Sequence, residues 1–230
     1  MSLAHRHRQP ELMDDPALDP AEHRRALAGL ARINAMSGSA KLLWPAIRKL
    51  ARIANRPLKV LDIATGSGDV PAALHRLSER ENLTIEFAGC DISPVAVEVA
   101  SRSGSAVQVF PLDVLRDPLP VGFDVFSCSL FLHHLDESDV VAVLRKMREA
   151  NPRLILVNDL ERSRFNYLAV WVTSRLCSRS RVVHVDGPLS IEGAFTVPEM
   201  WALAEQAGLT GATVRTAFPC RMLLEWRAGA

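Results

Sequence analysis

The sequence predicts an α/β fold, a doubly wound sheet of seven strands that is mostly parallel and has an antiparallel terminal strand. Between residues 58 and 159, short apolar segments alternate with segments whose apolar residues recur at helical spacing. Strands that alternate with helices in this way favour a parallel sheet covered on both faces. After residue 210 the chain holds two strand-like segments joined by a short turn, which predicts an antiparallel pair at one edge of the sheet.

The individual elements follow from local patterns. The segment 70–80 carries its apolar residues on one helical face, whereas FDVFSCSLFL at 123–132 is nearly all apolar, as a central parallel strand is. Residues 182–196 contain a glycine–proline pair and are predicted to form a linker. The predicted strands are 58–64, 83–92, 106–114, 123–132, 153–159, 211–219 and 221–227. The predicted helices that accompany them are 70–80, 94–103, 137–150, 164–179 and 197–207.

The residues before the first strand predict an N-terminal helical cap. Up to about residue 20 the chain has three prolines and mixed charges, which indicates loose structure, and residues 20–54 are helical in character. Within that stretch Leu43, Ile47 and Leu50 recur at helical spacing. We therefore expect a cap at 1–54 and a main domain at 55–230, with a helical insertion at 163–196.

Composition narrows the classes of partner. The chain of 230 residues is 48% hydrophobic and 23% charged, with a formal net charge of +1. Its arginines are scattered, so a solvated surface is favoured over a nucleic-acid site, which usually shows a concentrated basic excess. No pattern in the sequence predicts an oligomeric state.

Cysteine spacing and hydropathy indicate the compartment. Four cysteines lie far apart without a Cys-x-x-Cys pair, which argues against a zinc site and a disulfide framework, so no metal is expected. The first 16 residues are polar, which argues against a signal peptide. No apolar run approaches the roughly 20 residues that span a bilayer. We expect a cytoplasmic protein without stable membrane insertion.

The segment VLDIATGSGDVP at 60–71 predicts a strand, a tight glycine turn and the start of a helix, an arrangement that suits a nucleotide. A dinucleotide fingerprint needs a third glycine, but in the two possible registers Asp69 or Pro71 stands there. A carboxylate is also unfavourable where a pyrophosphate would lie. The phosphate-binding loop fails as well, because no Gly-Lys-Ser/Thr follows. An NAD-dependent or nucleotide-sugar enzyme is therefore disfavoured.

The same turn resembles the first motif of class I S-adenosylmethionine-dependent methyltransferases, Asp/Glu-x-Gly-x-Gly-x-Gly. Here the motif begins at Asp62 and includes Thr65, Gly66 and Gly68, with Ala64 in place of the first glycine. The resemblance implies a Rossmann-like fold and S-adenosyl-L-methionine as the cofactor. This cofactor carries no phosphate, so acidic residues near the turn are acceptable.

Further residues match the family at the ends of successive predicted strands. Asp91 corresponds to the residue that accepts both ribose hydroxyls, a task suited to an acceptor-only carboxylate, and Ile92 would pack on the adenine. Asp113 resembles the aspartate that binds the adenine amino group, with Val114 beside it. The backbone near Ser129 and Leu130 would flank the methionine portion of the cofactor. Ligands of such sheets bind at the carboxyl edge, where all these residues fall.

Three histidines are candidates for a general base. His133 follows the fourth strand, where plant phenolic O-methyltransferases carry a catalytic histidine, and His134 is its neighbour. His184 precedes the glycine–proline pair in the predicted pocket-covering region. An imidazole near neutral pH can accept a phenolic proton. The alternative for each is a histidine that packs, caps a helix or lines the pocket.

The predicted acceptor is a small aromatic or apolar molecule. The insertion carries Phe165, Tyr167, Trp171 and Arg175, which either cover the pocket or pack the helix on the domain. The segments ELMDDP, RRALAGLARIN and NDLERSR resemble bacterial methyltransferases of the ubiquinone/menaquinone type and those associated with type III polyketide synthase products. That resemblance implies O-methylation of a phenol or hydroquinone, with C-methylation of the ring as the alternative. A protein or RNA methyltransferase and a non-catalytic S-adenosylmethionine-binding protein are further alternatives.

Overall fold

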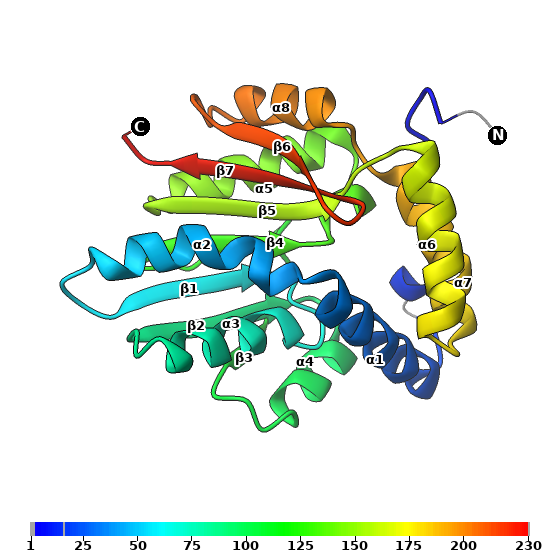
Figure 1. Cartoon of the computed structure of the whole chain (residues 1–230), viewed down its shortest axis with the longest axis horizontal. Coiled ribbons are helices and arrows are strands. Elements are labelled where there is room, and N and C mark those ends of the chain that lie inside the picture. Colours follow the sequence, from blue (N-terminus) through cyan, green and yellow to red (C-terminus); the bar gives the residue numbers. More distant parts are fainter. Residues whose placement is uncertain (1–2, 16, 230) are drawn as a thin grey trace.

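The apolar segments of the sequence form one seven-stranded sheet in a computed structural model that describes residues 3–15 and 17–229 (Figure 1). Residues 1, 2 and 16 of the predicted cap and residue 230 of the predicted main domain lie outside this description. The strands are β1 (Leu58–Ile63), β2 (Ile85–Asp91), β3 (Gln108–Pro111), β4 (Val125–Ser129), β5 (Leu154–Leu160), β6 (Thr213–Ala217) and β7 (Arg221–Arg227). The helices are η1 (Leu12–Asp14), α1 (Pro20–Ser37), α2 (Ser39–Arg52), α3 (Asp69–Arg80), α4 (Pro94–Ser101), η2 (Leu132–His134), α5 (Glu137–Glu149), α6 (Arg164–Cys177), α7 (Arg181–Gly193) and α8 (Val197–Gln206).

The strand order confirms the predicted fold class. The sheet runs β3-β2-β1-β4-β5-β7-β6, and the first five strands of the chain are parallel. Strand β7 lies antiparallel between β5 and β6, as the two terminal segments predict. The order reverses between β1 and β4, and this switch point is where ligands of open α/β sheets bind.

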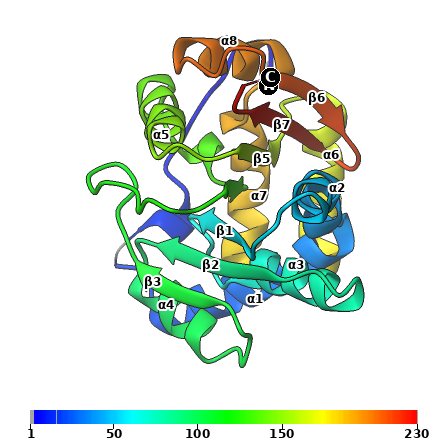
Figure 2. The ribbon, with the colours of Figure 1, turned by 90° about the vertical axis from the view of Figure 1, so that its left-hand side faces the viewer.

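The alternation of side chains along each strand explains why the strand sequences are so apolar. Val60 faces a core beneath α2 and α3, whereas its neighbour Leu61 faces a core beneath α5 and α8. In β4, Val125 likewise faces the core beneath α2 and α3, and Phe126 faces the core beneath α5 and α8. Both faces of the central strands are therefore buried, and Figure 2 shows the two helical layers on opposite sides of the sheet. Helix α2 packs directly on the sheet, while the division into a cap and a main domain stays a prediction.

Residues 182–196, predicted to be a linker, are mostly helical, so that prediction was wrong. Helix α7 runs through Gly187 and Pro188 and packs against α6 to form a hairpin. A Cβ at position 187 would lie 3.2 Å from Val170 Cγ1, so the glycine allows the two helices to approach closely. The glycine–proline pair usually marks a turn, but packing on α6 outweighs that local preference. Figure 1 shows the α6–α7 hairpin beyond the carboxyl ends of the parallel strands.

The N-terminal segment, expected to be loosely structured, has little regular structure but many tertiary contacts. The Arg6 guanidinium donates to the carbonyl oxygens of His133 (3.1 Å), Leu135 (2.5 Å) and Gly193 (2.6 Å) and stacks on the Phe195 ring. Arg6 thus connects the end of α7 to the segment after β4. Residues 3–15 lie over the carboxyl edge beside α7 as a consequence.

No helix among residues 3–15 and 17–229 combines the length and the apolar character needed to cross a lipid bilayer.

Candidate active site

The turn between β1 and α3 is held by hydrogen bonds that its own sequence supplies. Ala64 and Gly66 adopt left-handed backbone conformations, with φ of 51° and 57°, and Gly68, also left-handed, is the N-cap of α3. The Thr65 N–H donates to the Cys90 carbonyl at 2.9 Å, which ties the turn to the end of β2. The backbone of the turn therefore lies open at the carboxyl edge, and it presents no long side chain at the two glycines.

Asp62 lies beneath this turn and is fully buried. Its carboxylate accepts hydrogen bonds from Ser127 Oγ at 2.6 Å and Thr65 Oγ1 at 2.8 Å. Burial raises the pKa of Asp62 to about 7, although the two hydroxyl donors oppose the shift. Asp62 thus positions Thr65 and the turn.

Asp91 connects the same turn to the next strand. Its Oδ2 accepts from the Gly66 N–H and its Oδ1 accepts from the Ser93 N–H, both at 2.8 Å. Burial raises the pKa of Asp91, and the two backbone donors partly oppose it. Each carboxylate oxygen keeps one unused lone pair in these contacts, so Asp91 can still accept two hydroxyl donors.

The remaining predicted adenine residues lie at the ends of β2 and β3. Ile92 is 66% exposed next to Asp91, and Val114 is buried. Asp113 Oδ1 accepts from the Leu115 N–H at 2.9 Å, and the Leu112 N–H donates to the Asp91 carbonyl at 3.1 Å, so the two turns are in contact. The structure thus brings Asp91, Ile92 and Asp113 to one corner of the carboxyl edge.

Ser129 and Leu130 lie at the end of β4, on the other side of the switch point. Leu130 is left-handed with φ of 56°, and its N–H donates to the Asn158 carbonyl at 2.9 Å. Asn158 is fully buried beside Ser129, and its Oδ1 has no hydrogen-bond partner among the described residues. An unpaired buried carbonyl oxygen is costly, so it indicates a polar group of a ligand or a water at this edge.

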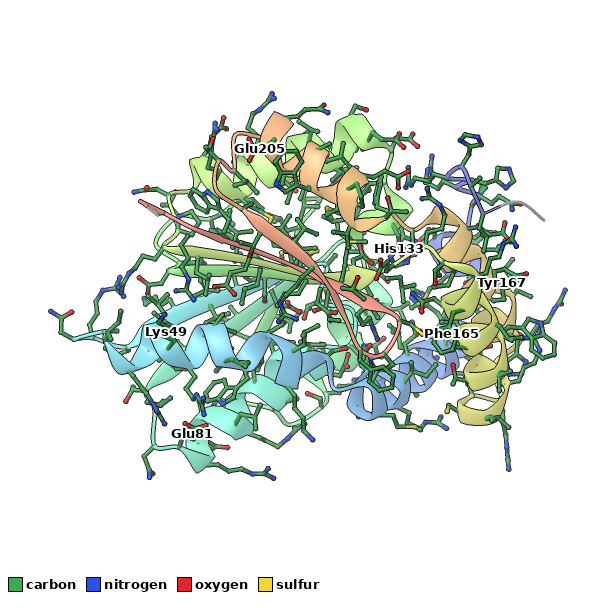
Figure 3. The ribbon with its side chains drawn as sticks, turned by 45° about the horizontal axis from the view of Figure 1, so that its top comes forward. Lys49, Glu81, His133, Phe165, Tyr167 and Glu205 are labelled. Atoms are coloured by element: carbon green, nitrogen blue, oxygen red, sulfur yellow. The ribbon has the colours of Figure 1, made fainter. Side chains whose placement is uncertain are left out.

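His133 and Asp159 form a buried pair. His133 Nδ1 lies 2.6 Å from Asp159 Oδ1, and the His133 N–H donates to Asp159 Oδ2 at 3.1 Å. Burial alone would raise the pKa of Asp159, but His133 and the Leu160 N–H lower it below its usual range. The ionised carboxylate only accepts, so Nδ1 of His133 carries the proton of this hydrogen bond, and Nε2 lies on the other side of the ring, 3.9 Å from Glu11 Oε1. Figure 3 places His133 between the sheet and the α6–α7 hairpin.

His134, in contrast to His133, lies beside carboxylates of the N-terminal segment. Its Nδ1 lies 3.0 Å from Asp14 Oδ2 and 3.8 Å from Glu11 Oε1, and its ring lies 4.2 Å from the His133 ring between centroids. Burial lowers the pKa of His134, but Glu11, Asp14 and Asp159 outweigh it and raise the value to about 9. The cluster therefore places a His134 that is protonated near neutral pH beside His133.

Among the described residues, the group that could hold a metal ion consists of Glu11, His133 and His134. One ligand atom each of Glu11, His133 and His134 lies within 4.8 Å of the others. His134 Nδ1 is already hydrogen-bonded to Asp14, and Glu11 Oε1 accepts from Ser190 Oγ at 2.8 Å. The prediction that the site holds no metal stays a prediction.

The third candidate histidine lies apart from the other two. His184 is on α7, and its Nε2 donates to the Ser178 carbonyl at 2.7 Å, which ties the start of α7 to the end of α6. In the insertion, Tyr167 packs against Leu160 and Ile191, whereas Phe165 and Trp171 are exposed. Arg175 stacks on Trp171 at 4.2 Å. Tyr167 is thus the residue of the predicted lining that faces the hairpin interior.

Sequence patterns did not reveal the carboxylates of the histidine cluster. Glu11 and Asp14 come from the N-terminal segment ELMDDP and Asp159 from NDLERSR at the end of β5, segments that were used for the family resemblance without a role for these carboxylates. Asp159 had one usable signal, since it follows a buried strand as Asp91 does. Gly89 was missed too; a Cβ there would lie 2.7 Å from Thr65 Cγ2, so it makes room for the turn.

Comparisons with known proteins agree with this geometry. Residues 60–151 match a family described as "Methyltransferase domain". This region of the chain is therefore similar to a methyltransferase domain. The matched region begins inside β1 and ends after α5, so it includes the glycine turn, Asp91, Asp113 and both histidines of η2.

Relatives of this methyltransferase domain include enzymes that act on small molecules. A demethylmenaquinone methyltransferase of Deinococcus radiodurans is 28% identical over 120 residues, which cover 50% of this chain and 48% of the relative. The chain thus spans about half the length of that curated relative. An O-methyltransferase from neocarzinostatin biosynthesis, solved with S-adenosylmethionine and 2-hydroxy-5-methyl naphthoic acid, has a TM-score of 0.65 and 24% identity, covering 95% of this chain and 61% of its own.

A second solved structure shows how widely the fold is shared. Human N-acetylserotonin methyltransferase, solved with S-adenosylmethionine, has a TM-score of 0.57 at 15% identity over 91% of this chain and 54% of its own. At these identities the structural likeness establishes the fold. The donor set of the methyltransferase domain fits the cofactor, because Asp91 keeps acceptor capacity for hydroxyls and the buried Asn158 Oδ1 lacks a donor.

Proposed function

We propose that this chain transfers a methyl group from S-adenosylmethionine to a small phenolic or quinone-like molecule, at oxygen. The observation that carries the proposal is the buried His133–Asp159 pair at 2.6 Å, which lies at the carboxyl edge, where β4 and β5 end. The naphthoic acid bound by the similar O-methyltransferase and the quinone named for the D. radiodurans relative support this class of acceptor.

In this proposal the β1, β2 and β3 ends hold the cofactor. Asp91 accepts the ribose hydroxyls, Ile92 and Val114 contact the adenine, and Asp113 accepts from its amino group. The backbone of Ala64, Gly66 and Gly68 allows a close approach, while Asp62 and Thr65 keep the turn in shape. Ser129, Leu130 and the Asn158 amide bind the methionine portion. When bound, S-adenosylmethionine supplies a methyl group on a positively charged sulfur that an oxygen nucleophile can attack.

His133 is the proposed general base. Its Nε2 takes the proton of the acceptor hydroxyl as the new O–CH₃ bond forms, and Asp159 stabilises the imidazolium that results. Glu11 Oε1 lies 3.9 Å from Nε2, so the acceptor hydroxyl would enter next to this carboxylate. His134, protonated near neutral pH, offsets the negative charge of Glu11 and Asp14.

The proposal leaves His184 as a residue that fastens α6 to α7, and it makes Tyr167 part of the pocket wall. The formal net charge of +1 gives no overall basic excess and so disfavours a nucleic-acid acceptor, as the composition predicts.

The test is turnover with 1,4-dihydroxy-2-naphthoic acid and 2-hydroxy-5-methyl naphthoic acid as acceptors. We expect release of S-adenosylhomocysteine and a methyl ether in the product, both identified by mass spectrometry and NMR. His133→Ala should lower kcat by a factor of about 10² to 10⁴, the range typical of a lost general base. His75→Ala, at a half-buried position of α3 outside the proposed site, is the matched control and should keep the wild-type rate.

Three results would contradict parts of this proposal. A methyl group on a ring carbon would assign C-methylation instead of O-methylation. An unchanged rate in His133→Ala would show that positioning alone carries the reaction, and a large loss in His184→Ala would move the base to α7. No turnover with any phenol or hydroquinone, despite tight S-adenosylhomocysteine binding, would exclude the acceptor class.

A further inference from the structure

Helix α6 carries an apolar stripe that no described part of the chain covers. Phe165, Leu168, Val172 and Leu176 are 72%, 61%, 38% and 79% exposed. At about 100° per residue, these four side chains fall within an arc of about 80° on one face of the helix. Single exposed apolar residues are ordinary, but a continuous stripe along about three turns of one helix marks an interaction surface.

The stripe is distinct from the face that packs on the protein. Tyr167 and Val170 lie on the other side of α6, where they contact the cluster formed by Leu160, Ile191 and Ala194. Ser174 is also buried on that side, next to Gly187 of α7. Helix α6 is therefore fixed to the hairpin by one apolar face and presents a second apolar face outward.

The charge around the stripe has one sign. From Arg162 to Val185 the chain contains no aspartate or glutamate. Arg164, Arg175, Arg179 and Arg181 are all exposed, and none of them forms an ion pair with any residue that the structure describes. Arg164 and Arg175 flank the stripe on one side of the helix. An apolar stripe bordered by unpaired arginines is the composition of a helix that lies in the interface of an anionic membrane.

We propose that α6 binds the surface of an anionic lipid bilayer, with its axis in the plane of the interface. The stripe enters the boundary between headgroups and acyl chains, and the four arginines pair with lipid phosphates. A second copy of this chain fits the surface less well, because a two-fold contact would bring the same arginine-rich face against itself without acidic partners.

The apolar stripe lies on the same side of the molecule as the proposed active site. The hairpin that carries it lies beyond the carboxyl ends of the strands, on the side where His133 lies (Figures 1 and 3). This step rests on the proposed function: the acceptor would be a phenol or quinone with an apolar tail that is dissolved in the bilayer. The hairpin then brings the pocket to the membrane face from which such an acceptor enters.

The test is sedimentation of the full chain with vesicles, without cofactor or acceptor, so that its outcome is independent of the methylation chemistry. Vesicles of phosphatidylcholine with phosphatidylglycerol should bind the protein, and vesicles of phosphatidylcholine alone should bind it much less. High salt should weaken the binding, because it screens the arginine contacts. Phe165→Ser and Leu176→Ser should each weaken vesicle binding by about tenfold, since each removes an apolar side chain that the bilayer would bury.

Matched controls separate the stripe from general surface effects. Ile53→Ser removes an equally exposed aliphatic side chain at the opposite end of the molecule and should leave vesicle binding unchanged. The double change Arg179→Gln and Arg181→Gln should weaken binding to anionic vesicles, whereas Arg215→Gln on β6 should not. These exposed positions carry no core contacts, so circular dichroism should show wild-type folding in every variant.

Two outcomes would overturn the proposal. Equal sedimentation with anionic and neutral vesicles, or unchanged binding by the stripe variants, would exclude a lipid surface. A dimer in light scattering that Leu176→Ser converts to a monomer, without loss of vesicle binding, would assign the stripe to a second copy. If the protein binds anionic vesicles as expected but does not methylate phenols, the membrane-binding proposal is supported and the proposed acceptor chemistry is wrong.

Discussion

Two halves of the carboxyl edge place their polar groups in different ways. In the cofactor half, at the ends of β1, β2 and β3, the side chains follow their own strands directly, and Asp91 binds Gly66 of the adjacent turn at 2.8 Å. In the histidine half, at the ends of β4 and β5, His133 and His134 meet Glu11 and Asp14, more than 110 residues away in the chain. Sequence motifs can therefore identify the cofactor half, whose residues are close together in the chain. The histidine half is assembled from distant segments, so its composition depends on the whole fold.

The two halves also differ in charge balance. The carboxyls of Asp62 and Asp91 have raised pKa values because burial dominates their surroundings. Burial opposes both shifts in the histidine half, but His133 lowers the pKa of Asp159, and Glu11 and Asp14 raise the pKa of His134. The cofactor half is therefore short of cations and suited to a cationic ligand, and the histidine half already contains its own counter-charges.

Asp159→Asn should produce the largest effect and should be confined to the histidine half. The amide cannot hold His133 in the tautomer with a free Nε2, so we expect kcat to fall on the order of a thousandfold. The affinity for S-adenosylhomocysteine should stay within about threefold of wild type. Steady-state kinetics with the naphthoic acids and calorimetry measure the two quantities. Asp136→Asn, which changes a surface pair with Arg8, is the matched control. A rate equal to wild type would show that the pair does not act in catalysis.

Arg6→Ala tests whether the N-terminal segment is part of the histidine half. The change leaves the carbonyls of His133 and Leu135 without their donor in a largely buried setting, so unfolding free energy should fall by about 2–3 kcal/mol. Arg8→Ala removes an exposed pair with Asp136 and should cost less than about 1 kcal/mol. Urea denaturation followed by circular dichroism measures both. Equal costs for the two arginines would mean that the segment is only loosely attached.

The pH dependence of stability should come from the histidine half. Because the pKa of His134 is raised to about 9 from an ordinary 6.5, its contribution is fully present below about pH 6.5 and is lost as the pH rises through 9. We expect a loss on the order of 2 kcal/mol over that window, measured as the free energy of unfolding at each pH. His134→Gln should remove most of this slope. If the slope is unchanged in that variant, another group is responsible.

The smallest effects should come from the two left-handed residues that end the central strands. Ala64→Gly should stabilise the fold by up to about 1 kcal/mol, because a glycine adopts φ of 51° without the Cβ clash. Leu130→Gly relieves the same clash but removes a side chain that packs on Leu160 and Ile191, so it should destabilise by about 1 kcal/mol. In thermal melts, the melting temperature should rise for Ala64→Gly and fall for Leu130→Gly. A shift in the same direction for both variants would contradict this reasoning.

The sequence alone predicted the fold class and the strand ends at which the residues of the cofactor half lie. Helical periodicity, apolar strands and the glycine turn are local signals, and the carboxyl ends of parallel strands necessarily meet at one edge. The roles assigned there to Asp91 and Asp113 remain predictions. Helix α7 was missed because Gly187 and Pro188 are local turn signals, and only packing against α6 shows that the glycine is a contact position.

The histidine half could be predicted only in part. His133 and His134 were found through a family pattern, but Glu11 lies in a proline-containing segment with no periodicity. Its proximity to His133 depends on the bonds of Arg6 and on Asp186, which accepts from the N–H groups of Leu12 and Met13 at 2.9 and 3.0 Å. Long-range closure of this kind leaves no pattern in one sequence.

The central claim is that the two halves divide the work, with cofactor binding in one and proton transfer in the other. Calorimetric titration of S-adenosylhomocysteine into wild type, Asp91→Ala and His133→Ala tests it most directly. The account predicts that Asp91→Ala weakens binding by about tenfold or more, since it loses charge-assisted hydrogen bonds, and that His133→Ala binds as wild type does. Equal binding by Asp91→Ala and wild type, or a comparable loss in both variants, would contradict the division.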